Sequence, residues 1–133
     1  MTFILDASVT AAWLLPDEKH PLGEKCRLRL ISEAALVPAI WWFEVRNLLI
    51  VAERRGRMTS ETTRTALEIL ARHSISEDTD VEDQQLLDVA RRHSLTIYDA
   101  AYLELAQRTG FPLATLDRRL ASAVQAAGLR AFE

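Results

Sequence analysis

The sequence repeats one arrangement three times: a short apolar segment ends in aspartate, and a helix is predicted to follow. The three segments are Phe3-Ile4-Leu5-Asp6, Thr96-Ile97-Tyr98-Asp99 and Ala114-Thr115-Leu116-Asp117. Short strands that alternate with helices favour a parallel sheet with helices packed on both of its faces. The sequence therefore predicts an α/β protein with a short parallel sheet flanked by helices.

Helices and strands are predicted along the whole chain, without a linker or an internal repeat. Because 133 residues is a usual size for one domain, residues 1–133 are expected to form a single domain. Helices are expected over Ser8–Leu15, Leu22–Glu33, Ile40–Arg55, Thr59–His73, Val81–His93, Asp99–Thr109 and Asp117–Ala127. Strands or extended turns are expected over Thr2–Leu5, Leu36–Val37, Ser74–Ser76, Thr96–Tyr98, Leu113–Leu116 and Leu129–Phe132.

The three aspartates Asp6, Asp99 and Asp117 are predicted to lie at one edge of the sheet. In open parallel sheets, ligands bind outside the carboxyl ends of the strands, which is where these side chains would be placed. Aspartate is also a preferred N-cap residue, so each of the three taken alone is better explained as a helix cap. Their occurrence at three equivalent places favours a shared site.

Glu44 is a fourth acid, and it lies within the most apolar predicted helix of the chain. It is either partly buried or at the margin of the apolar face, and burial of a carboxylate is costly unless the group is paired or bound to a metal. Four crowded carboxylates would repel one another, and a divalent cation would relieve that repulsion. Because the ligands would all be oxygens, one or two Mg²⁺ or Mn²⁺ ions are expected, as in many phosphate-cleaving sites.

The composition bears on binding partners and on location. The formal net charge is -3, which argues against a protein that coats DNA, although without the four acids it would be +1. Cys26 is the only cysteine, so no internal disulfide can form. The histidines are scattered, which argues against a zinc site. We expect no membrane span, no signal peptide and a cytoplasmic location.

Four segments of the chain resemble the four motifs of PIN domains, and most closely those of VapC-type toxins from bacterial and archaeal toxin–antitoxin pairs. The segments are Asp6-x-Ser8, Phe43-Glu44-Val45-Arg46-Asn47-Leu48-Leu49, Tyr98-Asp99-Ala100-Ala101-Tyr102-Leu103-Glu104-Leu105-Ala106 and Leu113-Ala114-Thr115-Leu116-Asp117. Each motif alone is weak, but the four agree in order and spacing over nearly the whole chain. The resemblance implies a three-layer α/β/α fold and a Mg²⁺- or Mn²⁺-dependent endoribonuclease that cleaves RNA.

The resemblance also implies roles for individual residues. The acidic tetrad that would hold the metal carries over to Asp6, Glu44, Asp99 and Asp117. Ser8, Thr115 and Asn47 fall where relatives often place supporting side chains, whereas Arg118 and Arg119 stand where some relatives have a further acid. The family further implies a homodimer and a cognate VapB-type antitoxin whose C-terminal segment blocks the site.

Two further groups of residues are candidates for binding partners. Trp13, Leu14, Leu15 and Trp42 are expected to line an apolar groove for the antitoxin, with packing in the core as the alternative. Trp41, on the apolar face of its helix, is expected in the core. Arg46, Arg118 and Arg119 lie within one helical turn of proposed metal ligands and are the candidates for contacts with RNA phosphates.

Two rival hypotheses remain from the sequence alone. A phospho-receiver module also has a parallel sheet and an acidic cluster, but it needs a lysine near the acids. The only lysines are Lys19 and Lys25, and neither follows a predicted strand. The second rival is an inactive PIN-like binding module, which the presence of all four acids disfavours.

Overall fold

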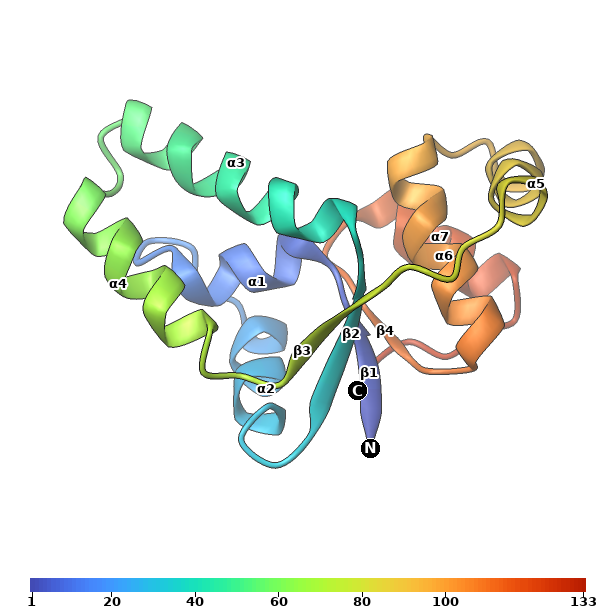
Figure 1. The fold of residues 1–133 in the computed structure, drawn as a ribbon, viewed down its shortest axis with the longest axis horizontal. Coiled ribbons are helices and arrows are strands. Elements are labelled where there is room, and N and C mark those ends of the chain that lie inside the picture. Colours follow the sequence, from blue (N-terminus) through green and yellow to red (C-terminus); the bar gives the residue numbers. More distant parts are fainter.

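The computed structural model describes residues 1–133 as a parallel sheet with helices on both sides (Figure 1). The four strands are β1 (Thr2–Leu5), β2 (Ala34–Pro38), β3 (Ile75–Asp78) and β4 (Leu113–Ala114). Their order in the sheet is β3-β2-β1-β4, and every neighbouring pair is parallel. All four carboxyl ends therefore meet at one edge, and the predicted α/β class is confirmed.

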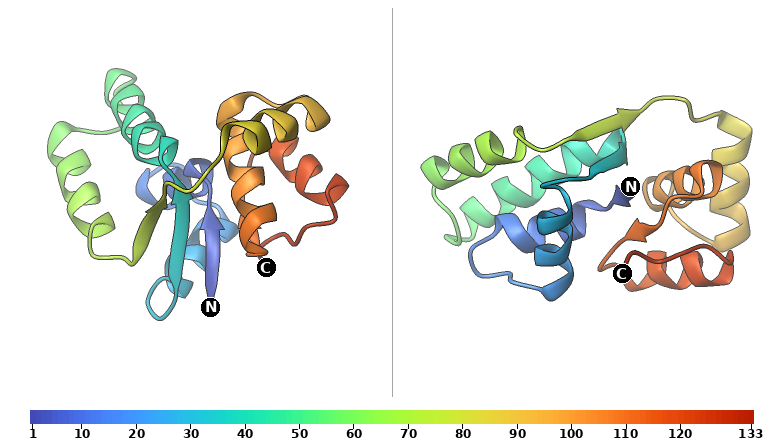
Figure 2. Two further views of the ribbon diagram at one scale, coloured as in Figure 1. Left: turned by 45° about the vertical axis from the view of Figure 1, so that its right-hand side comes forward. Right: turned by 90° about the horizontal axis from the view of Figure 1, so that it is seen from below.

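Seven helices cover the sheet: α1 (Ala7–Leu14), α2 (Pro21–Arg29), α3 (Ile40–Arg54), α4 (Ser60–Leu70), α5 (Asp83–His93), α6 (Ile97–Thr109) and α7 (Arg118–Ala126). Helices α1 to α4 lie to one side of the sheet and α5 to α7 to the other (Figure 2). Helices α1 and α2 pack closely, since a Cβ atom on Gly23 would lie 3.0 Å from the Cβ atom of Ala12. The arrangement is the three-layer α/β/α architecture.

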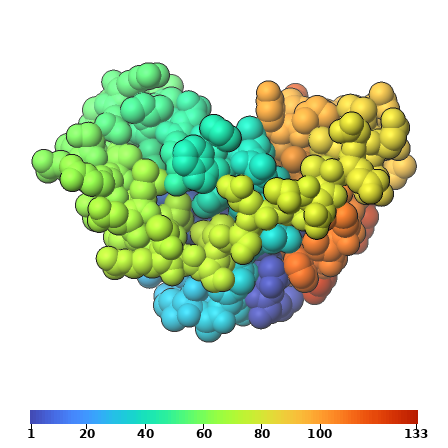
Figure 3. All heavy atoms as spheres, in the orientation of Figure 1, coloured from blue at the N-terminus to red at the C-terminus, as the bar shows by residue number.

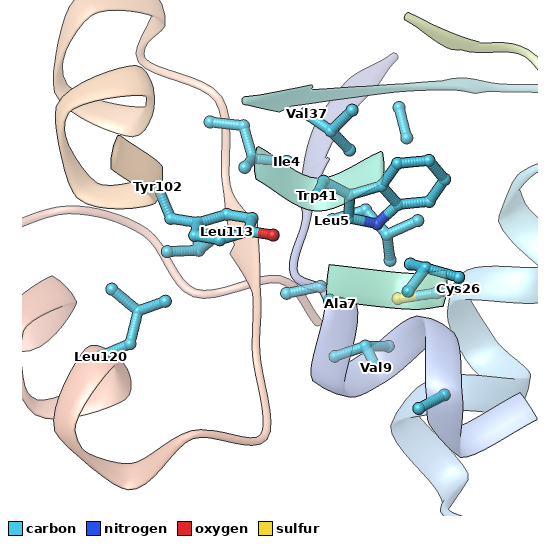
Figure 4. Packing of buried hydrophobic residues seen from close by; sticks show 14 of the residues in the cluster. Ile4, Leu5, Ala7, Val9, Cys26, Val37, Trp41, Tyr102, Leu113 and Leu120 are labelled. Atoms are coloured by element: carbon cyan, nitrogen blue, oxygen red, sulfur yellow. The ribbon is translucent and has the colours of Figure 1, made fainter. Parts of the chain in front are cut away.

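The core is built around β1, whose residues Phe3, Ile4 and Leu5 are all fully buried. This burial agrees with the uninterrupted apolar run in the sequence, because a strand covered by helices on both faces has no polar side. Tyr102 reaches from α6 toward the end of β1, where α1 begins at Ala7 (Figure 4). The core thus extends to the carboxyl edge of the sheet.

Two predicted strands differ in the structure. The segment Thr96–Tyr98 is not a strand: Thr96 is the N-cap of α6, and its Oγ1 accepts a hydrogen bond from the Asp99 backbone N–H at 3.2 Å. Ile97 and Tyr98 are exposed in the first turn of the helix, so their β-branched and aromatic character does not reflect burial in a sheet. The predicted strand Leu129–Phe132 is reduced to a single bridge between Ala131 and Leu113.

A cleft lies above the carboxyl edge of the sheet. The space-filling view shows a hollow between residues of α3 on one side and residues of α5 and α6 on the other (Figure 3). Both chain termini lie at the opposite, amino edge (Figure 1). The loops that follow β1 and β4, together with the first turns of α3 and α6, therefore surround the cleft.

Candidate functional site

Asp6 lies directly after β1 and is only 6% exposed. Its Oδ2 accepts two hydrogen bonds, from Ser8 Oγ at 2.8 Å and from Thr115 Oγ1 at 2.6 Å. Although Asp6 occupies the N-cap position of α1, its side chain makes no capping hydrogen bond. The explanation of Asp6 as a helix cap is therefore wrong, and its carboxylate is instead held by two hydroxyl groups.

The surroundings of Asp6 disfavour its charged form. Burial raises the pKa of the Asp6 carboxyl, and the hydrogen bonds from Thr115 and Ser8 oppose that rise without cancelling it. The nearby carboxylate of Asp117 raises the same pKa further. Asp6 is thus a buried acid whose ionisation a bound cation would favour.

The same two hydroxyl groups connect Asp6 to the loop after β4. Ser8 Oγ accepts a hydrogen bond from the Leu116 N–H at 3.0 Å, and Thr115 Oγ1 accepts one from the Asp117 N–H at 3.0 Å. Asp117 is a true N-cap, because its Oδ1 accepts from the Leu120 N–H at 3.1 Å. The loop therefore fixes Asp117 beside Asp6, although β4 ends at Ala114 and not, as predicted, at Leu116.

Glu44 projects from the second turn of α3 and is half-buried, which confirms the partly buried alternative. Its Oε1 accepts a 2.8 Å hydrogen bond from the hydroxyl of Tyr102 on α6. Burial raises the pKa of Glu44, the Tyr102 hydrogen bond opposes this, and the carboxylates of Asp6 and Asp99 add to the rise. This role of Tyr102 could not be predicted from the sequence, because helical spacing does not show where a hydroxyl group points.

Asp99 lies in the first turn of α6 and is half-buried. Because the cap is Thr96, Asp99 is neither a cap nor the end of a strand. Burial raises the pKa of Asp99, Asp117 and Asp6 raise it further, and the cation of Arg119 opposes them. The side chain therefore faces the other acids, although the route predicted from the sequence, through a strand, was wrong.

The effects of these carboxylates on one another's pKa values indicate that they lie within electrostatic reach of one another. The four acids, which come from different parts of the chain, are Asp6, Glu44, Asp99 and Asp117. As the side chains stand, no group of three or more Asp, Glu, His or Cys residues is arranged to hold a metal ion. The available donors are nevertheless carboxylates supported by hydroxyl groups, the type that hard divalent cations prefer. The donor chemistry thus fits Mg²⁺ or Mn²⁺.

The predicted arginines and Asn47 differ in their position relative to the acidic cluster. The Arg46 guanidinium stacks over the Trp42 ring, 4.0 Å from its centroid, and its Nη1 donates to the Trp42 carbonyl at 3.2 Å. Asn47 is exposed on the same helix. Arg118 and Arg119 are exposed at the start of α7, and only Arg119 acts on an acid of the cluster.

The predicted apolar groove is not formed as expected. Leu14 and Leu15 are buried in the core, 9% and 3% exposed, because α2 and α3 pack against α1. Trp13 is half-buried, with its ring edge-on to His73. Only Trp42, at 44% exposure, offers a large open surface. Leu14 and Leu15 are therefore core residues, and this part of the prediction is wrong.

Trp41 confirms the predicted core position. It is buried, and its Nε1 donates a 3.1 Å hydrogen bond to the buried hydroxyl of Thr10 on α1. This bond joins α3 to α1 one turn away from Glu44 and thereby fixes the side of α3 that faces the site.

Among the helices, none combines the length and the apolar character needed to cross a membrane.

Comparison with known proteins gives relatives over nearly the whole chain. The PIN domain family model matches residues 3–125. Ribonuclease VapC3 of Pyrobaculum aerophilum is 33% identical over 130 residues, which cover 91% of this chain and 93% of the relative. Ribonuclease VapC3 of Mycobacterium tuberculosis strain H37Rv is 38% identical over 104 residues, covering 73% of this chain and 70% of the relative.

Solved structures agree with the sequence relatives. The crystal structure of PAE2754 from Pyrobaculum aerophilum has a TM-score of 0.70 and 27% identity, covering 92% of this chain and 87% of that one. A chain from a Klebsiella pneumoniae toxin–antitoxin complex has the same fold, with a TM-score of 0.58, 17% identity and 86% coverage of both chains. The resemblance stated from the four motifs is confirmed, and this chain belongs to the PIN domain family, among its VapC-type members.

Proposed function

We propose that the chain is a metal-dependent endoribonuclease that hydrolyses RNA phosphodiester bonds and acts as the toxin of a toxin–antitoxin pair. The observation that carries the proposal is the cluster of Asp6, Glu44, Asp99 and Asp117 at the carboxyl edge of the sheet. The pKa values of the first three are raised above those of ordinary carboxyls. The names of the two VapC3 relatives support the same activity.

The chemistry expected at this site needs a cation and fixed acids. When bound, one or two Mg²⁺ or Mn²⁺ ions supply Lewis-acid chemistry, activating water and stabilising charge on the phosphoryl oxygens. Asp6, Glu44, Asp99 and Asp117 would hold the ions. Ser8 and Thr115 fix the orientation of the Asp6 carboxylate, and Tyr102 fixes that of Glu44. These donors also reduce the cost of keeping two partly desolvated carboxylates ionised.

The surroundings of the acids suit a polyanionic substrate. Arg46, Arg118 and Arg119 are the candidates for phosphate contacts, and Arg119 lies close enough to Asp99 to oppose the rise in its pKa. No lysine contributes to the shifted pKa values of Asp6, Glu44 or Asp99. The phospho-receiver alternative therefore gains no support, because it requires a lysine beside the acids.

An antitoxin and a second copy of the chain are the proposed protein partners. The Klebsiella chain was solved within a toxin–antitoxin complex, and the exposed Trp42, on the helix that carries Glu44, offers an aromatic anchor for such a partner. Truncation of an aromatic anchor typically costs about 2 kcal/mol or more of binding free energy. Trp42→Ala should therefore weaken antitoxin binding by that amount in calorimetric titration, and an unchanged affinity would exclude Trp42 from the interface.

The activity is tested by incubating purified protein with RNA in Mn²⁺, Mg²⁺ or EDTA. Cleavage is expected with either metal and not with EDTA. Asp99→Asn, which keeps the shape but removes a ligand charge, should abolish cleavage and growth inhibition while circular dichroism remains unchanged. Asp88→Asn is the matched control, because Asp88 is an exposed helical aspartate that pairs only with Arg91 on the surface. A folded Asp99→Asn protein that cleaves RNA at the wild-type rate would contradict the mechanism.

A further inference from the structure

A pocket of about 520 Å³ lies between the C-terminal end of α5 and helix α7. This volume falls within the range of sites that hold small ligands, roughly 300–1,000 Å³. The pocket is larger than a single phosphate group requires. Its lining consists of His93, Ser94, Leu95, Arg118, Arg119, Ser122, Ala123 and Ala126.

The lining of this pocket carries no acidic side chain. Four other surface pockets, of 380–510 Å³, each include at least one Asp or Glu. Arg118 and Arg119 form no ion pair within the chain, which is also true of seven of the other twelve arginines. Both guanidinium groups are thus free to bind an anion, and the hydroxyl groups of Ser94 and Ser122 add neutral donors.

The backbone at Ser94 points to a use for its side chain. Ser94 ends α5 in the left-handed conformation, with φ of 53°, and is the only residue other than glycine with positive φ. Glycine takes this conformation at the end of α6, where Gly110 has φ of 74°. A serine at such a position is less favourable than glycine but keeps a hydroxyl group at the rim of the pocket.

The pocket adjoins the acids at the start of α7. Arg118 and Arg119 line the pocket and directly follow Asp117, the N-cap of α7, whose carboxylate belongs to the acidic cluster. Leu95, on the pocket wall, directly precedes Thr96, the cap of the helix that carries Asp99. A chain-like ligand that leaves the acids on the side of α6 and α7 would therefore enter this pocket next.

We infer that this pocket is a nucleotide subsite, which holds one phosphate and its attached nucleoside from the RNA strand next to the bond that is cleaved. Arg118 and Arg119 bind the phosphate, with the serine hydroxyls as further donors. The apolar surface of Leu95, Ala123 and Ala126 contacts the sugar and base. The inference rests on the proposed ribonuclease function. It gives the path of the RNA strand over the protein surface, which runs from the acids toward α5.

Nucleic acid explains this pocket better than a protein partner does. Protein interfaces are anchored by large apolar and aromatic residues, and the only large apolar residue here is Leu95. An excess of free arginines without acids is instead typical of surfaces that bind a phosphate backbone. The exposed aromatic residues Trp42 and Phe43 lie elsewhere, on α3, and are not part of this pocket.

The test compares two pairs of adjacent arginines in the full chain. Arg118→Gln/Arg119→Gln changes the pocket, and Arg54→Gln/Arg55→Gln removes the same charge at the far end of α3, where neither arginine forms an ion pair. Binding of a fluorescently labelled single-stranded RNA of ten nucleotides is measured by anisotropy at several KCl concentrations in EDTA. EDTA prevents metal-dependent cleavage, and the repulsion from the unneutralised acids affects both variants alike.

We expect the pocket variant to bind at least tenfold more weakly than wild type. The plot of log association constant against log salt concentration should become shallower, with its slope reduced in magnitude by about 0.7 for each phosphate that the variant no longer neutralises. The control pair should change affinity less than twofold. Ser122→Leu, which fills the pocket without changing charge, should also weaken RNA binding and raise KM for cleavage in Mn²⁺.

Three outcomes would overturn the subsite. The two arginine pairs could weaken RNA binding equally, or the pocket variant could bind RNA as tightly as wild type. The pocket variant could also lose affinity for the antitoxin while its RNA binding stays intact. Failure of the ribonuclease proposal looks different, since wild type would then cleave no RNA in Mn²⁺ whatever the arginine variants bind. The two proposals can therefore fail separately.

Discussion

The hydroxyl of Tyr102 on α6 donates a 2.8 Å hydrogen bond to Glu44 Oε1 on α3 and so joins the two walls of the cleft. Tyr102 is fully buried, and burial together with the nearby carboxylates of Asp6 and Glu44 raises the pKa of its phenol well above the usual value. The phenol therefore stays protonated and remains a hydrogen-bond donor at neutral pH. Glu44 thus has a permanent donor that favours its ionised form.

Removal of this donor should raise the pKa of Glu44. Tyr102→Phe keeps the ring in the core, so the protein should fold, with a loss of about 1.5–3 kcal/mol for a hydrogen bond to a charged group. In the pH profile of RNA cleavage, the acidic limb should move to higher pH. Tyr98→Phe is the control, because Tyr98 lies one turn earlier on α6 and is exposed. An acidic limb that does not move would show that Glu44 is not among the groups that control the rate.

Thr115 is predicted to act through Asp6 rather than on the substrate. Thr115→Val keeps the shape of the side chain but removes the hydroxyl that donates to Asp6 Oδ2 and accepts from the Asp117 N–H. The pKa of Asp6 should rise, and the Mg²⁺ concentration for half-maximal cleavage should increase about tenfold, as for other residues that orient metal ligands. Thr115→Ser should restore both.

A half-buried threonine far from the acids provides the comparison for Thr115. The Thr109 hydroxyl donates to the Leu105 carbonyl at the end of α6, so Thr109→Val should leave the metal dependence unchanged. If Thr115→Val lowered only the stability and bound Mg²⁺ as wild type does, the hydroxyl would be purely structural. Titration of Mg²⁺ in the cleavage assay and thermal unfolding separate the two roles.

The acidic cluster should make the metal-free protein less stable as the pH rises. The pKa values of Asp6, Glu44 and Asp99 are raised by folding, so these groups bind protons more tightly in the folded than in the unfolded chain. Their favourable contribution to folding is present at low pH. It is lost as the pH rises from ordinary carboxyl values through the raised ones.

Glu44→Gln should therefore be more stable than wild type in EDTA at about pH 8, and this difference should shrink toward about pH 4. Glutamine keeps an oxygen that can accept from Tyr102. Glu24→Gln should instead be less stable than wild type at about pH 8, because Arg27 lowers the pKa of Glu24. The stabilisation that Glu24 contributes is present above the ordinary carboxyl pKa and is lost in acid, so this difference should also shrink toward about pH 4. Melting temperatures measured across this range provide the check, and equal behaviour of the two variants would contradict it.

The sequence predicted the α/β class, the seven helices and the strand before Asp6, because these follow from local patterns. Asp99 was reached by a wrong route, since no strand precedes it, and Asp117 lies three residues beyond the end of β4. Ile97 and Tyr98 favour a strand by residue type, but Thr96 and Asp99 are spaced as an N-cap and the third helical residue, a pattern that predicts a helix start. That signal was present in the sequence and outweighs the β-branched and aromatic residues.

Other features depend on tertiary packing that a single sequence does not reveal. The burial of Leu14 and Leu15 results from the close approach of α2 and α3 to α1, which no local pattern states. The hydrogen bond between Tyr102 and Glu44 joins residues 58 positions apart in the chain. The pocket beside α7 likewise requires the relative placement of α5 and α7.

A strongly destabilising substitution outside the site is expected at Arg108. Glu104 on α6 is 2% exposed, and Arg108, one turn later, donates to it from Nε at 2.7 Å and to Asp78 of β3 from Nη1 at 3.0 Å. Arg108→Met keeps the apolar stem of the side chain but leaves the buried Glu104 carboxylate without its cation. Removal of one partner of a buried ion pair costs roughly 3–5 kcal/mol, which is a large part of the stability of a small domain.

Arg91→Met is the matched control for this prediction, since Arg91 pairs with Asp88 on the exposed side of α5 and such surface pairs contribute about 0–1 kcal/mol. Urea unfolding followed by circular dichroism measures both values. A cost below about 1 kcal/mol for Arg108→Met would mean that the Glu104 carboxylate does not depend on this cation in the folded protein. Glu104→Gln/Arg108→Met tests this dependence: because it removes both charges, it should recover most of the loss only if the uncompensated carboxylate is responsible for it.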